Sequence, residues 1–173
     1  MAHTLLAVDP GKHDAGVAFF ISGVLTDAAL LIPKEPSPYN VAREVAMWAR
    51  RCMMNLGDPD GRISMVIVEG QQIYPTTSLS QSQQLLFLAQ VVGGVLARVD
   101  CFDHKIVLPK EWTKGVPKPV RQRRFLSVCS KYETDLIMAI KPAAKRHNTI
   151  DAICLGAFEL GRLRVTDPKE EVQ

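Results

Sequence analysis

Three short apolar runs separated by turn-forming residues begin this chain, and they restrict its fold more than any other feature of the sequence. The runs cover residues 4–8, Ala15–Ile21 and Val24–Leu31. Each is five to eight residues long, which is typical of a strand and short for a helix. Asp9-Pro10-Gly11 and Ser22-Gly23 stand between them and are typical turn sequences. The pattern predicts an antiparallel meander at the beginning of the chain.

After the meander, the spacing of apolar residues changes to strands that alternate with helices. The run SMVIV at 64–68 is uninterrupted, as in a strand buried on both faces of a parallel sheet. Ser78 and Gln81 form the pattern of a capping box at the start of a long helix. The predicted elements of this part are strands at 64–68 and 106–108 and helices at 40–56, 78–98, 121–129 and 149–163.

This order of elements predicts an α/β fold. We expect a mixed five-stranded sheet, an antiparallel meander followed by parallel strands, with helices on both faces. With 173 residues, of which 47% are apolar, the chain is long enough for one well-buried core. We expect a single domain over 1–166 and a polar tail at 167–173.

No segment of the sequence points to a membrane. No apolar run approaches the roughly 18–20 residues that a spanning helix needs. The first eight residues lack the basic region and long apolar core of a signal peptide. We therefore expect a cytoplasmic protein with no membrane partner.

Positive charge is concentrated in one part of the chain. Between Lys105 and Arg146 there are eleven lysines and arginines against three acids, a local charge of +8, whereas the remainder carries −5. Such segregation is typical of a face that binds a polyanion such as nucleic acid. A solvated basic surface explains the charge equally well, so the charge alone leaves both interpretations open.

Three acids lie where they can share a ligand. Asp9 and Glu69 each end an apolar strand, and Asp151 lies in the first turn of the last predicted helix. Open α/β sheets bind their ligands at the carboxyl ends of the strands. If the first and fourth strands are neighbours, Asp9 and Glu69 repel each other unless a cation holds them. Mg²⁺ and Mn²⁺ favour such oxygen ligands, and with Asp151 the product is a two-metal phosphodiester site.

Each acid also has a plain structural explanation. Asp9 is a common turn former before Pro and Gly. Glu69 fits a solvent-facing strand end, and Asp151 fits a helix start, where the macrodipole stabilises an acid by about 0.3–1 kcal/mol. For any one acid alone the structural explanation is favoured, and only their joint placement favours a site.

Three segments resemble the catalytic motifs of RuvC-type Holliday-junction resolvases, most closely the compact RuvC-like resolvases of bacteriophages. They are LLAVDPGKHDAGVAFF at 5–20, VIVEGQQIYP at 66–75 and HNTIDAICLGAFELG at 147–161. A fourth segment, VLPKEWTKG at 107–115, resembles the strand-Pro-x-x-Trp-Lys stretch of that family. The resemblance extends over nearly the whole chain, to about Leu163.

The resemblance implies a ribonuclease-H-like fold and a homodimer that cuts four-way DNA junctions symmetrically, in a bacterial or phage-infected host cell. It implies two Mg²⁺ or Mn²⁺ ions held by Asp9, Glu69 and Asp151. The family has an acid or a histidine three residues before the last aspartate, where this chain has Asn148, with His147 one position earlier. Either His147 or Asn148 is the fourth ligand. Ligand chemistry favours His147, which also suits a proton-handling role.

The resemblance also points to DNA contacts. Tyr74 is the aromatic residue of the loop where the family carries an aromatic wedge, although Gln72 occupies the closer position. A base stacked on Tyr74 contributes roughly 1–3 kcal/mol, but Tyr74 fits simple loop packing equally well. For Trp112 we favour packing in the core over a sugar contact. The residues expected to neutralise phosphates are Lys110, Lys114, Lys118, Arg121, Arg123, Arg124, Lys145 and Arg146.

The helix from Ser78 to Arg98 has more apolar residues than an amphipathic helix with one buried stripe and one solvent-exposed face. We expect part of it to pack on a second subunit, with Gly93-Gly94 permitting close approach. Packing entirely within one chain is the alternative. A twofold axis suits cleavage of two symmetric strands.

Together these features predict a crossover junction endodeoxyribonuclease that works by two-metal phosphodiester hydrolysis. Two alternatives remain open: the same fold acting on an RNA–DNA hybrid or on generic branched DNA, and a junction-binding protein without catalysis, in which Asn148 marks a decayed site. An ATPase of this fold ranks last, because the chain is too short for two lobes and has no Walker-type loop.

Overall fold

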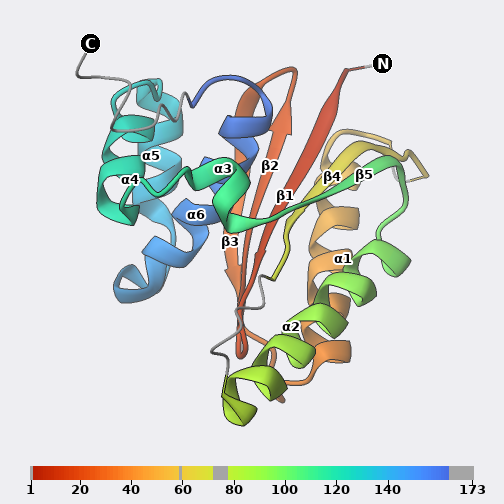
Figure 1. Ribbon diagram of the computed structural model, residues 1–173. Coiled ribbons are helices and arrows are strands. Elements are labelled where there is room, and N and C mark those ends of the chain that lie inside the picture. Colours follow the sequence, from red (N-terminus) through yellow and green to blue (C-terminus); the bar gives the residue numbers. More distant parts are fainter. Residues whose placement is uncertain (1, 59, 72–77, 164–173) are drawn as a thin grey trace.

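The computed structural model describes residues 2–58, 60–71 and 78–163, and in this part the chain forms a five-stranded mixed sheet (Figure 1). The strand order is β3-β2-β1-β4-β5. β2 is antiparallel to β1 and to β3, whereas β4 is parallel to β1 and to β5. The strands are β1 (Thr4–Pro10), β2 (Ala15–Ile21), β3 (Val24–Leu31), β4 (Ile63–Glu69) and β5 (Cys101–Val107). The predicted fold class is confirmed.

The turn between β2 and β3 uses left-handed backbone. Ser22 has a φ of 49° and Gly23 a φ of 84°. Two consecutive residues of this kind match the right-handed twist of the flanking strands and so favour a tight hairpin. Both residues of the predicted turn, Ser22 and Gly23, therefore have the conformation that the meander needs.

Helices cover both faces of the sheet. α1 (Pro38–Asn55) and α2 (Leu79–Arg98) pack on one face, and α6 (Arg146–Glu159) packs on the other (Figure 1). Successive residues of a strand point to opposite faces, and this alternation divides β1 between two cores. Leu6 and Val8 belong to the core under α1 and α2, whereas Leu5 and Ala7 belong to the core under α6.

α6 is buried on almost every side. All residues from Thr149 to Ala157 are buried, because the sheet covers one side of the helix and α4 packs on the other, while α5 packs on β3 (Figure 1). Gly156 allows the helix to lie close to the sheet, since a Cβ atom there would be 2.3 Å from the ring of Phe20. The middle and the end of α6 are therefore held firmly against the strands.

Serine side chains begin both helices of the other layer. The Ser37 Oγ accepts a hydrogen bond of 3.1 Å from the N–H of Asn40. The Ser78 Oγ accepts one from the N–H of Gln81, whose side chain accepts the N–H of Ser78 in return. The predicted capping box is confirmed.

Several predicted boundaries were wrong. The strand expected at 106–108 is β5, which begins at Cys101; it is an edge strand with exposed polar residues, so it lacks the apolar run that marked the others. The short helix between β5 and α4 and the helix after α4 were not predicted, and a single 3₁₀ turn precedes α6. These elements are α3 (Pro109–Thr113), α4 (Lys118–Leu126), α5 (Lys131–Ala139) and η1 (Ala143–Lys145).

The predicted domain ends at residue 166, and the predicted tail follows at 167–173; residues 164–173 lie outside the described part of the chain. The boundary therefore stays a prediction. None of the helices in the described ranges is long and apolar enough to cross a membrane.

Candidate active site

β1 and β4 bring Asp9 and Glu69 to the same edge and the same face of the sheet. The strands are parallel, and their register pairs the residues that immediately precede these two acids. Because side chains alternate, Asp9 lies on the same face as Ala7, and Glu69 on the same face as Ile67. Ala7 and Ile67 belong to the core under α6, so both carboxylates lie on the side of the sheet that α6 covers.

α6 supplies the third acid. Asp151 is buried and lies in the second turn rather than the first, since the helix begins at Arg146, earlier than predicted. Both of its carboxylate oxygens have partners. The Lys118 ammonium group pairs with Oδ2, and the Gln122 amide donates a hydrogen bond of 3.1 Å to Oδ1. A guanidinium nitrogen of Arg121 is 4.0 Å from Oδ1.

The three carboxylates repel one another. Burial, and then the charges of Glu69 and Asp151, raise the pKa of Asp9 well above its usual range. Burial also raises the pKa of Glu69; the Trp112 hydrogen bond opposes this rise, and the charge of Asp151 adds to it. Two ionised carboxylates buried together are unfavourable unless a cation lies between them. The ends of β1 and β4 therefore favour the binding of a cation.

The three acids interact electrostatically, but their carboxylates are not arranged as a complete set of metal ligands. Within the described ranges, no group of three or more His, Cys, Asp or Glu side chains is arranged to hold a metal ion. Asp151 is paired with Lys118 and Gln122 instead of being gathered with the other two acids. The metal-ligand role predicted for Asp9, Glu69 and Asp151 stays a prediction.

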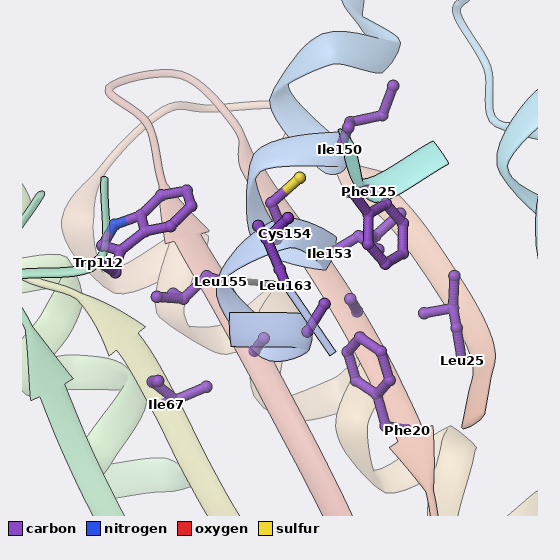
Figure 2. Close-up of a cluster of buried hydrophobic side chains, with 14 of the residues drawn as sticks. Phe20, Leu25, Ile67, Trp112, Phe125, Ile150, Ile153, Cys154, Leu155 and Leu163 are labelled. Atoms are coloured by element: carbon purple, nitrogen blue, oxygen red, sulfur yellow. The ribbon is translucent and has the colours of Figure 1, made fainter. Parts of the chain in front are cut away.

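Trp112 fixes one oxygen of Glu69. Its indole Nε1–H donates a hydrogen bond of 3.0 Å to Oε2 of Glu69, and its side chain is 1% exposed. Figure 2 shows the ring at the edge of the core under α6. The packing role that we favoured for Trp112 is confirmed, and its hydrogen bond to a candidate site residue was not predicted.

Arg121 requires a correction. We expected it to bind phosphate from the surface, but the residue is buried. Its guanidinium lies 4.6 Å from the centre of the Trp112 ring, and it donates a hydrogen bond of 2.6 Å to the Val116 carbonyl. Held in this way, the Arg121 guanidinium stacks on Trp112 and faces Asp151 instead of lying on the open surface.

Gln122 and Asp14 were missed by the sequence analysis. Gln122 follows Lys118 by four residues, so both side chains lie on the face of α4 that meets α6. This spacing was the one signal for Gln122. Asp14 is buried before β2; its Oδ2 lies 3.2 Å from the Lys145 ammonium, and its carbonyl accepts the N–H of Gly11. The ion pair connects the turn after Asp9 to the segment that leads into α6.

Gly16 allows that segment to approach β2. A Cβ atom at Gly16 would lie 2.4 Å from the carbonyl oxygen of Asn148, a contact that no side chain tolerates. Gly16 pairs with Asp9 in the sheet. The absence of a side chain at Gly16 therefore lets the first turn of α6 lie beside the end of β1.

His147 and Asn148 lie on α6 near Asp151. His147 is exposed and Asn148 half-buried. They precede Asp151 by four and three residues, which places all three on one side of the helix. The His147 carbonyl accepts a hydrogen bond of 3.2 Å from Gln122. The choice between the two as a fourth ligand remains open.

The other predicted DNA contacts differ in their surroundings. Lys110, Lys114 and Arg123 are exposed, and Arg124 is half-buried. Lys118 and Lys145 pair with acids, as described above. Arg146 donates hydrogen bonds to the carbonyls at positions 138 and 140, and it thereby fastens the end of α5 to α6. Gln72 and Tyr74 lie outside the described residues, so their predicted contacts stay predictions.

An apolar groove runs along α2 and the edge of the sheet. It has a volume of about 460 Å³. Leu86, on its wall, is 61% exposed, and Leu79, at the start of the helix, is 78% exposed. The apolar groove is lined by Gly70, Gln71, Ser82, Leu85, Leu86, Ala89, Val92, Gly93, Leu96 and Ile106. The second part of α2 packs on α1, so the excess of apolar residues is explained only in part by packing within the chain.

Comparison with protein-family models finds no match, and comparison with curated proteins finds none either. Solved structures do match. One is T. thermophilus RuvC in complex with a Holliday junction substrate, with 15% sequence identity, a TM-score of 0.56, and coverage of 94% of this chain and 98% of that one. Another is the yeast mitochondrial Holliday junction resolvase Ydc2, with 11% identity, a TM-score of 0.55, and coverage of 96% and 82%.

At these identities the likeness establishes the fold. The mixed sheet with helices on both faces has the ribonuclease-H-like fold. Within that class, the chain has the fold of the RuvC-type Holliday-junction resolvases, as its motifs implied.

Proposed function

We propose that this protein is a divalent-metal-dependent endonuclease that resolves four-way DNA junctions by symmetric phosphodiester cleavage. The main support is the parallel pairing of β1 and β4, which puts Asp9 and Glu69 side by side at the strand ends. The fold shared with T. thermophilus RuvC, which was solved with a Holliday junction, supports branched DNA as the substrate. The closer likeness to bacteriophage enzymes and the cytoplasmic location rest on the sequence alone.

The donor set at the strand ends fits Mg²⁺ or Mn²⁺. Asp9 and Glu69 offer the oxygen ligands that these hard cations prefer. Burial and the charges of neighbouring carboxylates raise the pKa values of Asp9 and Glu69, and a bound cation would offset that repulsion. When bound, the ion supplies an activated water and stabilises the leaving oxygen. A second ion, and further ligation by Asp151, His147 or Asn148, rest on the family resemblance alone.

The residues around the acids position them. The Trp112 hydrogen bond to Oε2 of Glu69 leaves Oε1 for a ligand. Arg121 stacks on Trp112 and restricts the movement of its indole. Lys110, Lys114 and Arg123 contribute exposed positive charge on the segments next to the site, where they bind DNA phosphates. Such binding weakens as salt concentration rises.

We propose that two copies of the chain associate through the apolar groove along α2. Exposed Leu86 gives the wall of the apolar groove a surface that water disfavours, and a second copy of the same helix is its natural cover. A twofold axis would present two sites to two symmetric strands of a junction.

The decisive experiment is cleavage of a synthetic mobile four-way junction in Mg²⁺ or Mn²⁺, mapped on all four strands. We expect paired symmetric nicks, none of which form in EDTA, and loss of cleavage in Asp9→Asn. Asp135→Asn, which changes an exposed acid on α5, should cleave like the parent. In EDTA, Asp9→Asn should also be more stable to unfolding than the parent, because it removes one of the repelling charges.

Other outcomes would identify the alternatives. Preferential cleavage of an RNA–DNA hybrid or of forked DNA would change the substrate and keep the chemistry. Tight junction binding without cleavage in saturating Mn²⁺ would identify a non-catalytic junction-binding protein. If Asp9→Asn cleaves as well as the parent, the assignment of Asp9 is wrong.

A further inference from the structure

A second pocket lies at the opposite end of β4 from the candidate site. It opens beside Ile63, the first residue of β4, whereas Glu69 is the last residue of that strand. One face of α1 forms a wall, and the turn from α2 to β5 borders it. The volume is about 510 Å³, which is the usual size of a ligand site. The lining of this α1 pocket includes Arg43, Met47, Arg50 and Met53 of α1, together with Ile63 and Arg98.

The floor of the α1 pocket is apolar. Met53, Ile63 and Val99 line it, and each is buried. Met47 also lines it but is 54% exposed, and a flexible thioether adapts its shape to a partner. This floor suits one apolar side chain of a ligand. No described residue lines both the α1 pocket and the apolar groove along α2.

Three exposed arginines surround this floor. Arg43 and Arg50 come from the same face of α1, and Arg98 ends α2. Within the described part of the chain, the Arg50 guanidinium has neither an ion pair nor a hydrogen bond. Arg43 is 3.5 Å from Glu44, an exposed pair of the kind that contributes little. The positive charge is therefore available to a ligand.

Arg98 is held in an orientation that suits binding. Its guanidinium carbon lies 4.7 Å from the centre of the Tyr39 ring, and it donates a hydrogen bond of 3.3 Å to the Gly94 carbonyl. These contacts leave further N–H groups of the guanidinium for a carboxylate. A side chain that is already oriented loses less conformational freedom on binding.

Two aspartates of the α1 pocket determine which kind of anion fits. Asp60 and Asp100 belong to the lining, and Asp100 pairs with Arg62 at 2.6 Å. DNA carries phosphates at every step of its backbone, so a duplex laid over the pocket would bring some of them against these carboxylates. A peptide carries separate acidic groups beside apolar ones. The mixed charge and the apolar floor therefore favour an acidic peptide over DNA.

We propose that the α1 pocket binds a short acidic segment of a partner protein. One apolar side chain of the segment packs on Met53 and Ile63, and its carboxylates pair with Arg50 and Arg98. Arginine offers two parallel N–H donors to a carboxylate, and arginine clusters are a recurring means of recognising acidic motifs. The residues involved are separate from Asp9 and the other acids of the candidate site, so this binding does not depend on the proposed nuclease activity.

The test is fluorescence anisotropy of a labelled hexapeptide, four aspartates followed by leucine and phenylalanine, titrated with the full chain. We expect saturable binding with a Kd below about 100 μM, and Arg50→Glu should weaken it about tenfold. Arg51→Glu is the matched control, because Arg51 is the next residue of α1, is exposed and does not belong to the lining. It should change the Kd by less than about twofold. Thermal unfolding checks that both variants fold like the parent.

Four results would overturn the inference. The first is no saturable binding up to about 1 mM peptide. The second is equal weakening by Arg50→Glu and Arg51→Glu, which would show an unspecific attraction between charges. The third is equal weakening by Lys114→Glu, which would place the peptide on the basic segment between Lys105 and Arg146. The fourth is displacement of the peptide by a short DNA duplex with Arg50→Glu weakening the duplex equally, which would assign the α1 pocket to DNA. A peptide with serines in place of the aspartates should bind at least about tenfold more weakly.

Discussion

Glu133 connects three parts of the chain through its two carboxylate oxygens. Arg162 donates hydrogen bonds of 2.6 and 2.9 Å to them, and the backbone N–H groups of Leu25 and Ser130 donate two more. Burial disfavours the ionised form, but these hydrogen bonds outweigh it and lower the pKa of Glu133 to about 2. One buried acid thus fastens α5 to the start of β3 and to the segment after α6.

Glu133→Gln should lower the free energy of unfolding by about 3 kcal/mol at pH 7, because it leaves the Arg162 charge without its partner. The pKa of Glu133 is lower in the folded than in the unfolded protein, so its stabilisation is complete above about pH 4.5 and is lost as the pH falls toward 2. Urea unfolding of parent and variant between pH 7 and pH 3 measures this difference. Asp135→Gln, on the exposed side of the same helix, should change little, and a difference that grows as the pH falls would contradict the account.

The sequence predicted the positions of some site residues and not the roles of others. Asp9 and Glu69 were identified because each ends an apolar run, and the strand ends did bring them together. Arg121 and Lys118 looked alike in the sequence, as two members of one basic segment. The packing of α4 on α6 separated them, since it buried Arg121 over Trp112 and left Lys118 at the rim beside Asp151.

At the scale of elements, the contact between α6 and β2 positions the third acid. Gly16 lies beside the backbone of Asn148, so the start of α6 reaches the end of β1 only because Gly16 has no side chain. The site therefore depends on how closely a helix approaches a strand, in addition to the identity of the acids.

Gly16→Ala should lower the free energy of unfolding by about 2 kcal/mol, within the usual range for overpacking a core. The added methyl group would meet the Asn148 carbonyl and push the first turn of α6 away from β1. Thermal and urea unfolding measure the loss. Lys12→Ala, in the exposed turn just before β2, should leave stability almost unchanged. Equal stability of Gly16→Ala and the parent would mean that α6 adjusts freely.

Elements with strong apolar periodicity were predicted well, and the others were not. β1, β2 and β3 were placed within two residues, because their apolar runs end at turn-forming residues. β5 was misplaced because it is an exposed edge strand in which Asp103, His104 and Lys105 interrupt the apolar residues. α5 was missed because it is short, and its start depends on a Ser130–Glu133 cap rather than on an apolar stripe.

At the scale of the whole molecule, the apolar groove lies mainly along α2, and it adjoins the candidate site at Gly70 and Gln71, which follow Glu69. Leu86→Glu puts a charge on the wall of the apolar groove and should convert the proposed dimer to a monomer. Light scattering coupled to gel filtration measures the mass. Leu79→Glu changes an exposed leucine of α2 that does not line the groove, so it should weaken association less. The monomer should lose paired nicking of a junction while retaining its metal site. A parent that is monomeric at all concentrations would contradict the proposed dimer.

The order of the strands and of the helices with clear apolar periodicity, and the three acids on them, follow from the sequence itself, because apolar periodicity and turn residues act over a few neighbouring positions. The partners of those acids, and the ion pair between Asp14 and Lys145, do not follow from the sequence. Lys118 and Gln122 on Asp151, Trp112 on Glu69, and Asp14 on Lys145 join residues between 29 and 131 positions apart. Such pairs are decided when the helices pack on the sheet, since burial makes an unpaired polar group or charge costly and so selects the partners that lie within reach.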